Sequence, residues 1–207
     1  MTREVALSHG GRSMADTVTS LGGSPLKVGD WGLDAVYSGT QKCLSCTPGL
    51  SPVTFSERAI DAVKNRGSKV QSWFMDLNLV LGYWGGGAKR AYHHTAPVNA
   101  LYGLHEALVI LQEEGIENAW QRHRQNHLAL RAGVEAMGLE FVVNEADRLP
   151  QLNSVSIPPD VDDAAVRSRL LDAYGLEIGA GLGPLAAELW RIGLMGFAGN
   201  RKNVRLC

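Results

Sequence analysis

The sequence predicts an α/β protein in which a larger first part is followed by a small α+β unit. Two observations support this fold class. In the first part, short apolar, β-prone runs alternate with turn-rich loops and a helical pattern. From residue 139 onward, the patterns follow one another in the order strand, strand, helix, strand, strand. We therefore divide the 207-residue chain into one part over 1–113 and a second over 114–207.

The first part contains three strand patterns and one clear helix pattern. Residues 33–38 are apolar and β-prone, which is typical of a buried strand. The helix is predicted over 56–66, with Ser56 as its N-cap. The stretch over 69–88 is aromatic and then glycine-rich, and no element is assigned to it. The other two strands are predicted at 14–18 and 50–55.

Two long helices lead into the second part. Pro97 allows a helix to start, and apolar residues recur at helical spacing over 98–115. A second helix is predicted over 116–138, where Gly138 supplies a stop signal. The remaining elements are strands at 139–144, 153–158, 176–181 and 189–196, a helix at 162–175, and the opening of an amphipathic helix from 200 to the end.

Charge and composition indicate which kinds of binding partner and which cellular compartment are expected. The formal net charge is −1, which argues against nucleic acid or an anionic membrane as a partner. The longest apolar runs fall well short of the ~20 residues that a membrane-spanning helix needs. Three cysteines do not make a disulfide framework, so a reducing compartment, by default the cytoplasm, is expected.

Two polar residues follow strand patterns in the first part. Lys42 comes directly after "YSGTQ", beyond the strand at 33–38, and Asp16 lies in the strand before a glycine-rich loop. The carboxyl ends of strands are where α/β folds place ligands. A lysine there can form a Schiff base, and a carboxylate can hold a ring nitrogen protonated. Taken singly, each residue is better explained by its ordinary role, Lys42 as a solvated lysine and Asp16 as a loop-capping aspartate.

A third residue, Arg191, lies inside the apolar run "LWRIGLMG". A strand of this kind is an unusual place for an unpaired arginine. Its planar guanidinium could grip a substrate carboxylate through two hydrogen bonds. A buried salt bridge to an acidic residue elsewhere is the alternative.

Several motifs together resemble one known family. They are "DTVTSLGGSPL", "YSGTQK" followed by "PGLSPVTFS", "RAYHHTAP" and "WRIGLMG", and they occur in the family's order from residue 14 to the end of the chain. The sequence is similar to the alanine–glyoxylate and serine–pyruvate (or serine–glyoxylate) aminotransferases, which are class V, fold-type I enzymes dependent on pyridoxal 5′-phosphate. The resemblance implies that 1–113 is part of the large cofactor-binding domain and 114–207 the small C-terminal domain.

The resemblance also implies roles for individual residues. Lys42 looks like the Schiff-base lysine, Asp16 like the partner of the pyridinium nitrogen, and Gln41 like a residue that helps to hold the cofactor phosphate. Arg191 corresponds to the arginine that binds the substrate carboxylate. Tyr92 and Thr95 correspond to residues that reach the phosphate bound in the other subunit, so a homodimer is expected. No metal is implied.

The activity implied is transfer of an amino group from alanine or serine to a 2-oxo acid such as glyoxylate or pyruvate. The family's glycine-rich phosphate loop lies upstream of Asp16 and has no counterpart here, and family chains are nearly twice as long. We therefore expect the sequence to be the C-terminal half of such an enzyme, with its last helix cut. Two alternatives stay open: a non-catalytic dimerising scaffold, or a related class V enzyme such as a cysteine desulfurase.

Other motifs receive weaker interpretations. Cys43 and Cys46 have the spacing of a redox pair, but the following Thr-Pro-Gly indicates a turn rather than the helix N-terminus that such a site needs. The "GAGLGP" loop resembles a dinucleotide loop, but Pro184 takes the place of the third glycine. His93 and His94 are neighbours in sequence and point apart. His123 and His127 lack the glutamate of a zinc motif and are expected on a solvated helix surface.

Overall fold

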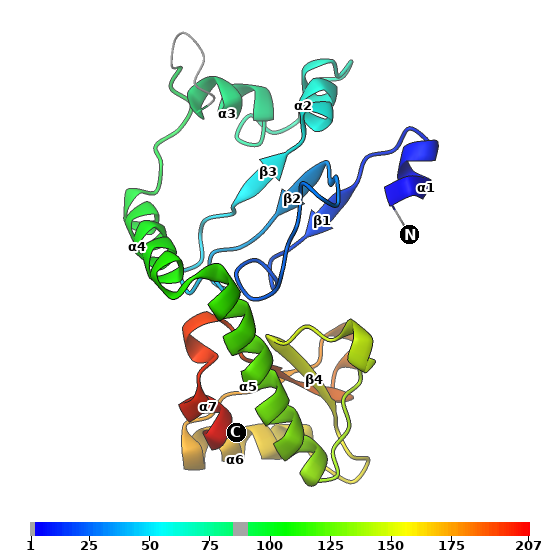
Figure 1. The fold of residues 1–207 in the computed structure, drawn as a ribbon, viewed down its shortest axis with the longest axis vertical. Coiled ribbons are helices and arrows are strands. Elements are labelled where there is room, and N and C mark those ends of the chain that lie inside the picture. The colour runs from blue at the N-terminus through cyan, green and yellow to red at the C-terminus, as the bar shows by residue number, and fades with distance from the viewer. Residues whose placement is uncertain (1–2, 85–90) are drawn as a thin grey trace.

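The computed structural model describes residues 3–84 and 91–207. Within these residues, an elongated molecule holds one three-stranded sheet in each half, and two long helices join the halves (Figure 1). The α/β architecture predicted from the sequence is confirmed.

The first sheet has the order β1–β2–β3, with β1 at Met14–Asp16, β2 at Ala35–Tyr37 and β3 at Val53–Phe55. Strands β1 and β2 are parallel, which places Asp16 beside Tyr37 at their carboxyl ends. Strand β3 is antiparallel to β2. The three predicted strands are therefore present, each shorter than its sequence pattern, because the chain turns into loops at their ends.

Three short helices belong to this part: α1 at Arg3–Ser8, α2 at Glu57–Lys64 and α3 at Leu77–Trp84. Helix α2 confirms the predicted helix, and its N-cap is Ser56, whose side chain accepts a hydrogen bond from Ala59 N (3.1 Å). Helices α1 and α3 were not predicted. None of the residues of α3 is buried, and its apolar residues lie all round the helix, so it lacks the one-sided stripe that identifies a surface helix.

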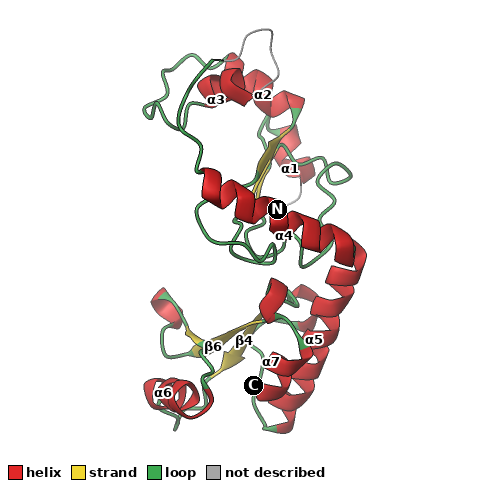
Figure 2. Cartoon of the chain, turned by 90° about the vertical axis from the view of Figure 1, so that its left-hand side faces the viewer, coloured by secondary structure: helices red, strands yellow, loops and turns green. Residues whose placement is uncertain are grey.

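Helices α4 (Val98–Glu114) and α5 (Ile116–Ala136) confirm the two long predicted helices. Gly115 separates them with φ 81° and ψ 131°, a backbone conformation that is open to glycine and strained for other residues. Gly138, with φ 76°, follows the end of α5, so the predicted stop signal is confirmed as well. The long axis of α5 runs beside the second sheet (Figure 2).

The second sheet has the order β4–β6–β5, with β4 at Leu152–Ser156, β5 at Gly179–Ala180 and β6 at Leu189–Gly193. Both pairings are antiparallel. The strand predicted at 139–144 is wrong: only an isolated bridge between Phe141 and Val155 forms there. The chain leaves the sheet after this bridge for an exposed turn at Glu145–Asp147, so no ladder can develop.

The second part has its own apolar core. Helix α6 (Asp163–Tyr174) begins at Asp162, which caps Ala165 N (3.0 Å), and helix α7 (Arg201–Leu206) packs near α5. The buried core residues from α5, the sheet and the adjoining loops are Leu130, Val134, Val155, Ile178, Trp190 and Leu194. In the part of the chain that the structure describes, no helix has the length and apolar character to cross a membrane.

Candidate functional site

The parallel strands β1 and β2 end together and bring two polar side chains to one edge of the first sheet. Asp16 is exposed; its Oδ1 accepts a hydrogen bond from Val18 N (2.8 Å) and its Oδ2 accepts one from the Tyr37 hydroxyl (2.9 Å). This hydrogen bond raises the pKa of Tyr37, since loss of the phenol proton would place two negative charges together. Both carboxylate oxygens are thus oriented by the protein.

The loops that follow these two strands are tied to each other. Thr17 donates its hydroxyl to Tyr37 O (2.8 Å), and Ser38 donates its hydroxyl to Thr17 O (3.0 Å). Thr17 and Ser38 are both buried. The loop after β1 therefore holds the loop after β2 directly beyond the strand ends.

Lys42 lies in that second loop and is half-buried. Thr40, fully buried, donates its hydroxyl to Thr47 O (2.7 Å) and accepts the Cys46 N–H at its carbonyl (3.1 Å). Ser45 N–H donates to Lys42 O (3.0 Å) and closes a turn. In the described part of the chain, nothing forms a hydrogen bond or ion pair with Lys42 Nζ, so its amine is available for chemistry. Gln41 beside it is exposed.

Arg191 lies in β6, in the second sheet, opposite Gly179 and Ser154 on the neighbouring strands. Its Nε donates to Ala180 O (2.7 Å). Among residues 3–84 and 91–207, no acidic side chain pairs with Arg191, so the salt bridge considered as an alternative is not found there. Since Nε is already engaged, the two terminal Nη atoms are the ones left for a ligand.

Tyr92 and Thr95 form an exposed hydroxyl pair between α3 and α4. The Tyr92 hydroxyl lies 2.8 Å from Thr95 Oγ1, and 74% of Tyr92 is exposed. No hydrogen bond or ion pair links this pair to Asp16 or Lys42 in the described part of the chain. The structure therefore places Asp16, Gln41 and Lys42 in one region, and Arg191 and the hydroxyl pair elsewhere on the chain.

The expectation that His123 and His127 lie on a solvated surface is wrong. His123 is fully buried, its Nδ1 lying 2.6 Å from Ala119 O, and its Nε2 accepts the Gly196 N–H (3.0 Å). His127 is buried with Nδ1 2.6 Å from Asn153 Oδ1. Burial lowers the pKa of His123. The flanking arginines suggested solvent, but α5 turns its histidine face toward the second sheet.

The two cysteines of the redox-like spacing are free thiols. Cys43 is buried, and this burial raises its pKa to about 11, which disfavours the thiolate that either a redox pair or a desulfurase needs. The expectation that His93 and His94 point apart is wrong, because their Nδ1 atoms lie 2.8 Å from each other. His93 is also buried against the Trp73 ring, with the ring centroids 4.1 Å apart. No cluster of three potential metal ligands occurs in the described residues.

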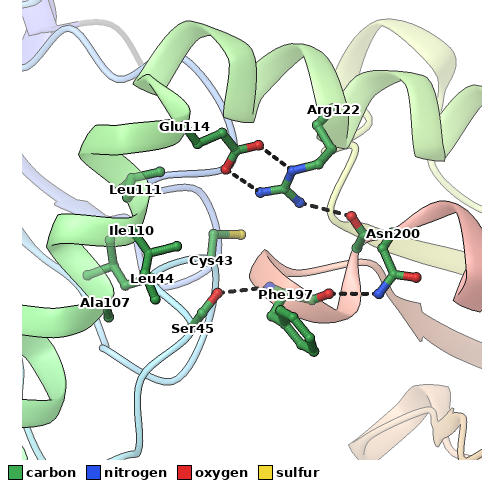
Figure 3. A pocket seen from close by; sticks show the side chains of 11 residues that line it. Cys43, Leu44, Ser45, Ala107, Ile110, Leu111, Glu114, Arg122, Phe197 and Asn200 are labelled. Carbon is green, nitrogen blue, oxygen red and sulfur yellow. Dashed lines mark hydrogen bonds and ion pairs between the residues drawn. The ribbon is translucent and has the colours of Figure 1, made fainter.

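A cavity of about 440 Å³ lies beside the lysine loop, between α4, α5 and the turn at 196–200 (Figure 3). Glu114 and Arg122 form an ion pair at its rim, and Ser45 accepts a hydrogen bond from Phe197 N (2.8 Å). The contact between Ser45 and Phe197 could not be predicted from the sequence, in which the two residues lie far apart. Apolar lining residues include Leu44, Ile110 and Leu111.

Comparisons with known proteins agree with this arrangement. The family model described as "Aminotransferase class-V" matches residues 3–195. An alanine–glyoxylate aminotransferase of Callithrix jacchus is 42% identical over 195 residues, covering 93% of this chain and 47% of the relative. An (S)-ureidoglycine–glyoxylate transaminase of Bacillus subtilis is 36% identical over 92% of this chain and 50% of the relative.

Solved structures show the same similarity. The crystal structure of an alanine–glyoxylate aminotransferase from Nostoc sp. has a TM-score of 0.93 and 46% sequence identity, over 98% of this chain and 53% of that chain. A ureidoglycine–glyoxylate aminotransferase from Bacillus subtilis has a TM-score of 0.92 and 37% identity. The chain spans about half the length of the curated relatives that it matches.

Proposed function

The chain belongs to the class V aminotransferase family, and we propose that it forms the lysine-bearing half of an enzyme that transfers an amino group from alanine or serine to a 2-oxo acid such as glyoxylate or pyruvate. The observation that supports this most strongly is the shared carboxyl end of the parallel strands β1 and β2, where β1 ends on an oriented carboxylate and the loop after β2 carries an unengaged lysine amine. Relatives named as glyoxylate aminotransferases support the substrate class.

Pyridoxal 5′-phosphate is the cofactor proposed, since class V aminotransferases generally depend on it. The residues present fit its ring and aldehyde: Lys42 offers an amine and Asp16 a negative charge at one sheet edge. When bound, the cofactor supplies an aldehyde that captures amino groups and a protonated ring that withdraws electrons. For its phosphate, the assigned residues are the exposed Gln41 and the hydroxyls of Tyr92 and Thr95, the last two serving the neighbouring subunit of a homodimer.

Each residue then has a physical task. The Lys42 amine would act as general base and then general acid, taking the proton from the substrate Cα and giving it to the cofactor carbon that bore the aldehyde. Asp16 keeps a positive charge on the ring nitrogen by electrostatic attraction. Arg191 binds the substrate carboxylate through its Nη atoms, because its Nε is held by Ala180 O (2.7 Å).

We assign residues 1–113 to the cofactor-binding part and 114–207 to a small C-terminal domain. The boundary is supported by Gly115, where α4 and α5 meet at a conformation that suits glycine. It is also supported by the separate apolar core of the second part.

The test compares Lys42→Ala with Lys27→Ala, a control at an exposed lysine. With pyridoxal phosphate and borohydride, the wild type and the control should be labelled covalently on the peptide that contains Lys42, and Lys42→Ala should not. In the whole enzyme of which this chain is proposed to be half, pyruvate formation from alanine and glyoxylate should fall by ~10²–10⁴-fold in Lys42→Ala, the usual contribution of a positioned acid–base group. Labelling at a different lysine, or equal activity, would contradict the assignment.

A further inference from the structure

The loop that carries Lys42 is held from outside its own sheet. The turn at Gly196–Ala198, which follows β6 in the second part, lies against the turn at 42–45. Phe197 N–H donates to Ser45 Oγ (2.8 Å), as Figure 3 shows. A Cβ at Gly196 would lie 2.0 Å from Ser45 Oγ and 3.2 Å from the carbonyl oxygens of Lys42 and Cys43, so the two backbones meet at a distance that only glycine permits.

Ser45 itself has a strained backbone. Its φ is 60°, and in the described part of the chain Ala187 is the only other non-glycine residue with positive φ. Such a conformation is strained for a residue that has a Cβ. It persists only where surrounding contacts determine it, and here Ser45 N–H binds Lys42 O (3.0 Å) while its hydroxyl accepts the Phe197 N–H.

The turn at Gly196–Ala198, which binds Ser45, is itself held by side chains of α5. Arg122 Nη1 donates to Gly196 O (2.8 Å) and to Gly199 O (2.9 Å), and Glu114 orients the guanidinium from α4 through Nη2 (2.8 Å). The Gly196 N–H donates to His123 Nε2 (3.0 Å). Both backbone polar groups of Gly196 are therefore bound by side chains of α5, and the turn presents the Phe197 N–H to Ser45 from a rigid base.

From these contacts we propose that Ser45 is a positioning residue for Lys42: its hydroxyl, docked on the Phe197 N–H, fixes the turn from which the lysine side chain leaves the sheet edge. The role given to Lys42 in this inference rests on the proposed function. The contact between the turn at 42–45 and the turn at Gly196–Ala198 does not depend on that function. The link also connects the sheet that carries Arg191 to the loop that carries Lys42, since the turn at Gly196 follows β6 directly.

The experiment compares Ser45→Ala and Ser45→Gly with the control Ser168→Ala, which removes a surface hydroxyl bonded to Asp172 on α6 (3.1 Å). Hydrogen exchange of the protein without cofactor is followed on the peptide covering 40–47. Both Ser45 variants should exchange about tenfold faster at the Ser45 and Cys46 amides, as expected for loss of one supporting hydrogen bond, and also at the Phe197 amide, which loses its acceptor. Peptides outside these two turns and the melting midpoint should match the control.

Ser45→Gly separates the effect of losing the hydroxyl from the effect of backbone strain, because glycine adopts φ 60° without strain. For the same reason this variant should fold even if Ser45→Ala does not. If Ser45→Gly exchanges like the wild type, relief of strain has replaced the hydroxyl and the proposal is wrong. If both variants match Ser168→Ala, the link does not fix the loop and the proposal is equally wrong.

A second readout concerns the amine. The rate of borohydride labelling of Lys42 and kcat should fall in both Ser45 variants by about tenfold, with KM for the amino acid unchanged, because the Arg191 contacts are untouched. Equal labelling rates would overturn the positioning role. If the wild type is not labelled at Lys42 at all, the proposed function fails, while the exchange contrast still decides whether the turn at Gly196 holds the loop.

Discussion

The two parts of the molecule are stabilised in different ways. The second part has a contiguous apolar core of large side chains around Trp190 and Val155. The first part buries mainly small apolar residues beside Leu44, together with the polar residues Thr17, Asp34, Ser38 and Thr40. A core of large apolar groups stabilises a part on its own, whereas a polar network fixes geometry and adds little net stability. The first part is therefore built for precise placement and the second for independent stability.

The surface of the first part also has a distinctive feature. The first part exposes large apolar side chains around α3, including Trp73, Phe74, Met75 and Trp84, each more than half exposed. Exposed apolar surface of this extent is typical of contact surfaces. Tyr92, in the same region, is proposed to serve a second subunit, so association and function would use neighbouring surfaces.

The largest expected effect is on the apolar core of the second part. Trp190→Ala should lower the free energy of unfolding by about 3–5 kcal/mol, since it removes a large buried ring and leaves a cavity. Trp31→Ala, at a residue 46% exposed, is the matched control and should change stability far less. Denaturant unfolding measures both. Similar losses for the two variants would show that the second part does not depend on this core.

The next effect concerns ligand binding on that stable sheet. Arg191→Lys keeps the charge and loses the planar pair of donors, so KM for amino and oxo acids should rise about tenfold to hundredfold, the value of a charged hydrogen bond. Because the core beneath is intact, the melting temperature and the absorption of bound cofactor should stay as in the wild type. Loss of cofactor instead would show that Arg191 is structural and does not bind the substrate carboxylate.

A smaller effect is expected in the polar network of the first part. Asp34 is buried and accepts hydrogen bonds from Ser13, Ser56 and Arg58, and the Arg58 guanidinium holds its pKa well below the ordinary 3.8. Asp34→Ala should cost about 1–3 kcal/mol through the unsatisfied donors left behind, and Asp160→Ala, at an exposed aspartate, should be neutral.

The same carboxylate predicts a pH dependence. Its pKa is lower in the folded chain than in the unfolded chain, so between the two values the unfolded chain binds more protons. The stability that Asp34 contributes is therefore complete above pH 3.8 and is lost as the pH falls below that value. Asp34→Ala should show a flatter decline in acid than the wild type; parallel curves would contradict the role.

The smallest expected effect is at the hydroxyl pair. Tyr92→Phe should weaken binding of pyridoxal phosphate about three- to tenfold, the value of one hydrogen bond, without changing the melting temperature. Tyr102→Phe, at an equally exposed tyrosine on α4, should leave binding unchanged. Cofactor titrations at several protein concentrations measure the effect, which should disappear where the subunits dissociate. If Tyr92→Phe weakened cofactor binding in isolated monomers as well, Tyr92 would not bind the cofactor of a second subunit.

Features that depend on a local sequence pattern could be predicted from the sequence. The strands, the α2 cap at Ser56, the long helices and the stop at Gly138 all depend on neighbours in the sequence. The positions of Asp16 and Lys42 after neighbouring strands were predictable for the same reason, and the parallel pairing of β1 and β2 agrees with it. Among the elements, the failures were the strand at 139–144, which lacks a full partner, the short helix α1, and helix α3, which lacks a one-sided apolar face.

The sequence by itself determined most of the elements, the family and the residues that are candidates for the chemistry, because these depend on local periodicity and on motifs of a few residues. The tertiary structure alone decided the burial of His123 and the docking of Ser45 on Phe197. It also decided the fixing of the turn at Gly196 by Arg122. Each of these contacts joins residues that are distant in sequence, so each exists only once α5 has packed on the second sheet and the two sheets have been brought together.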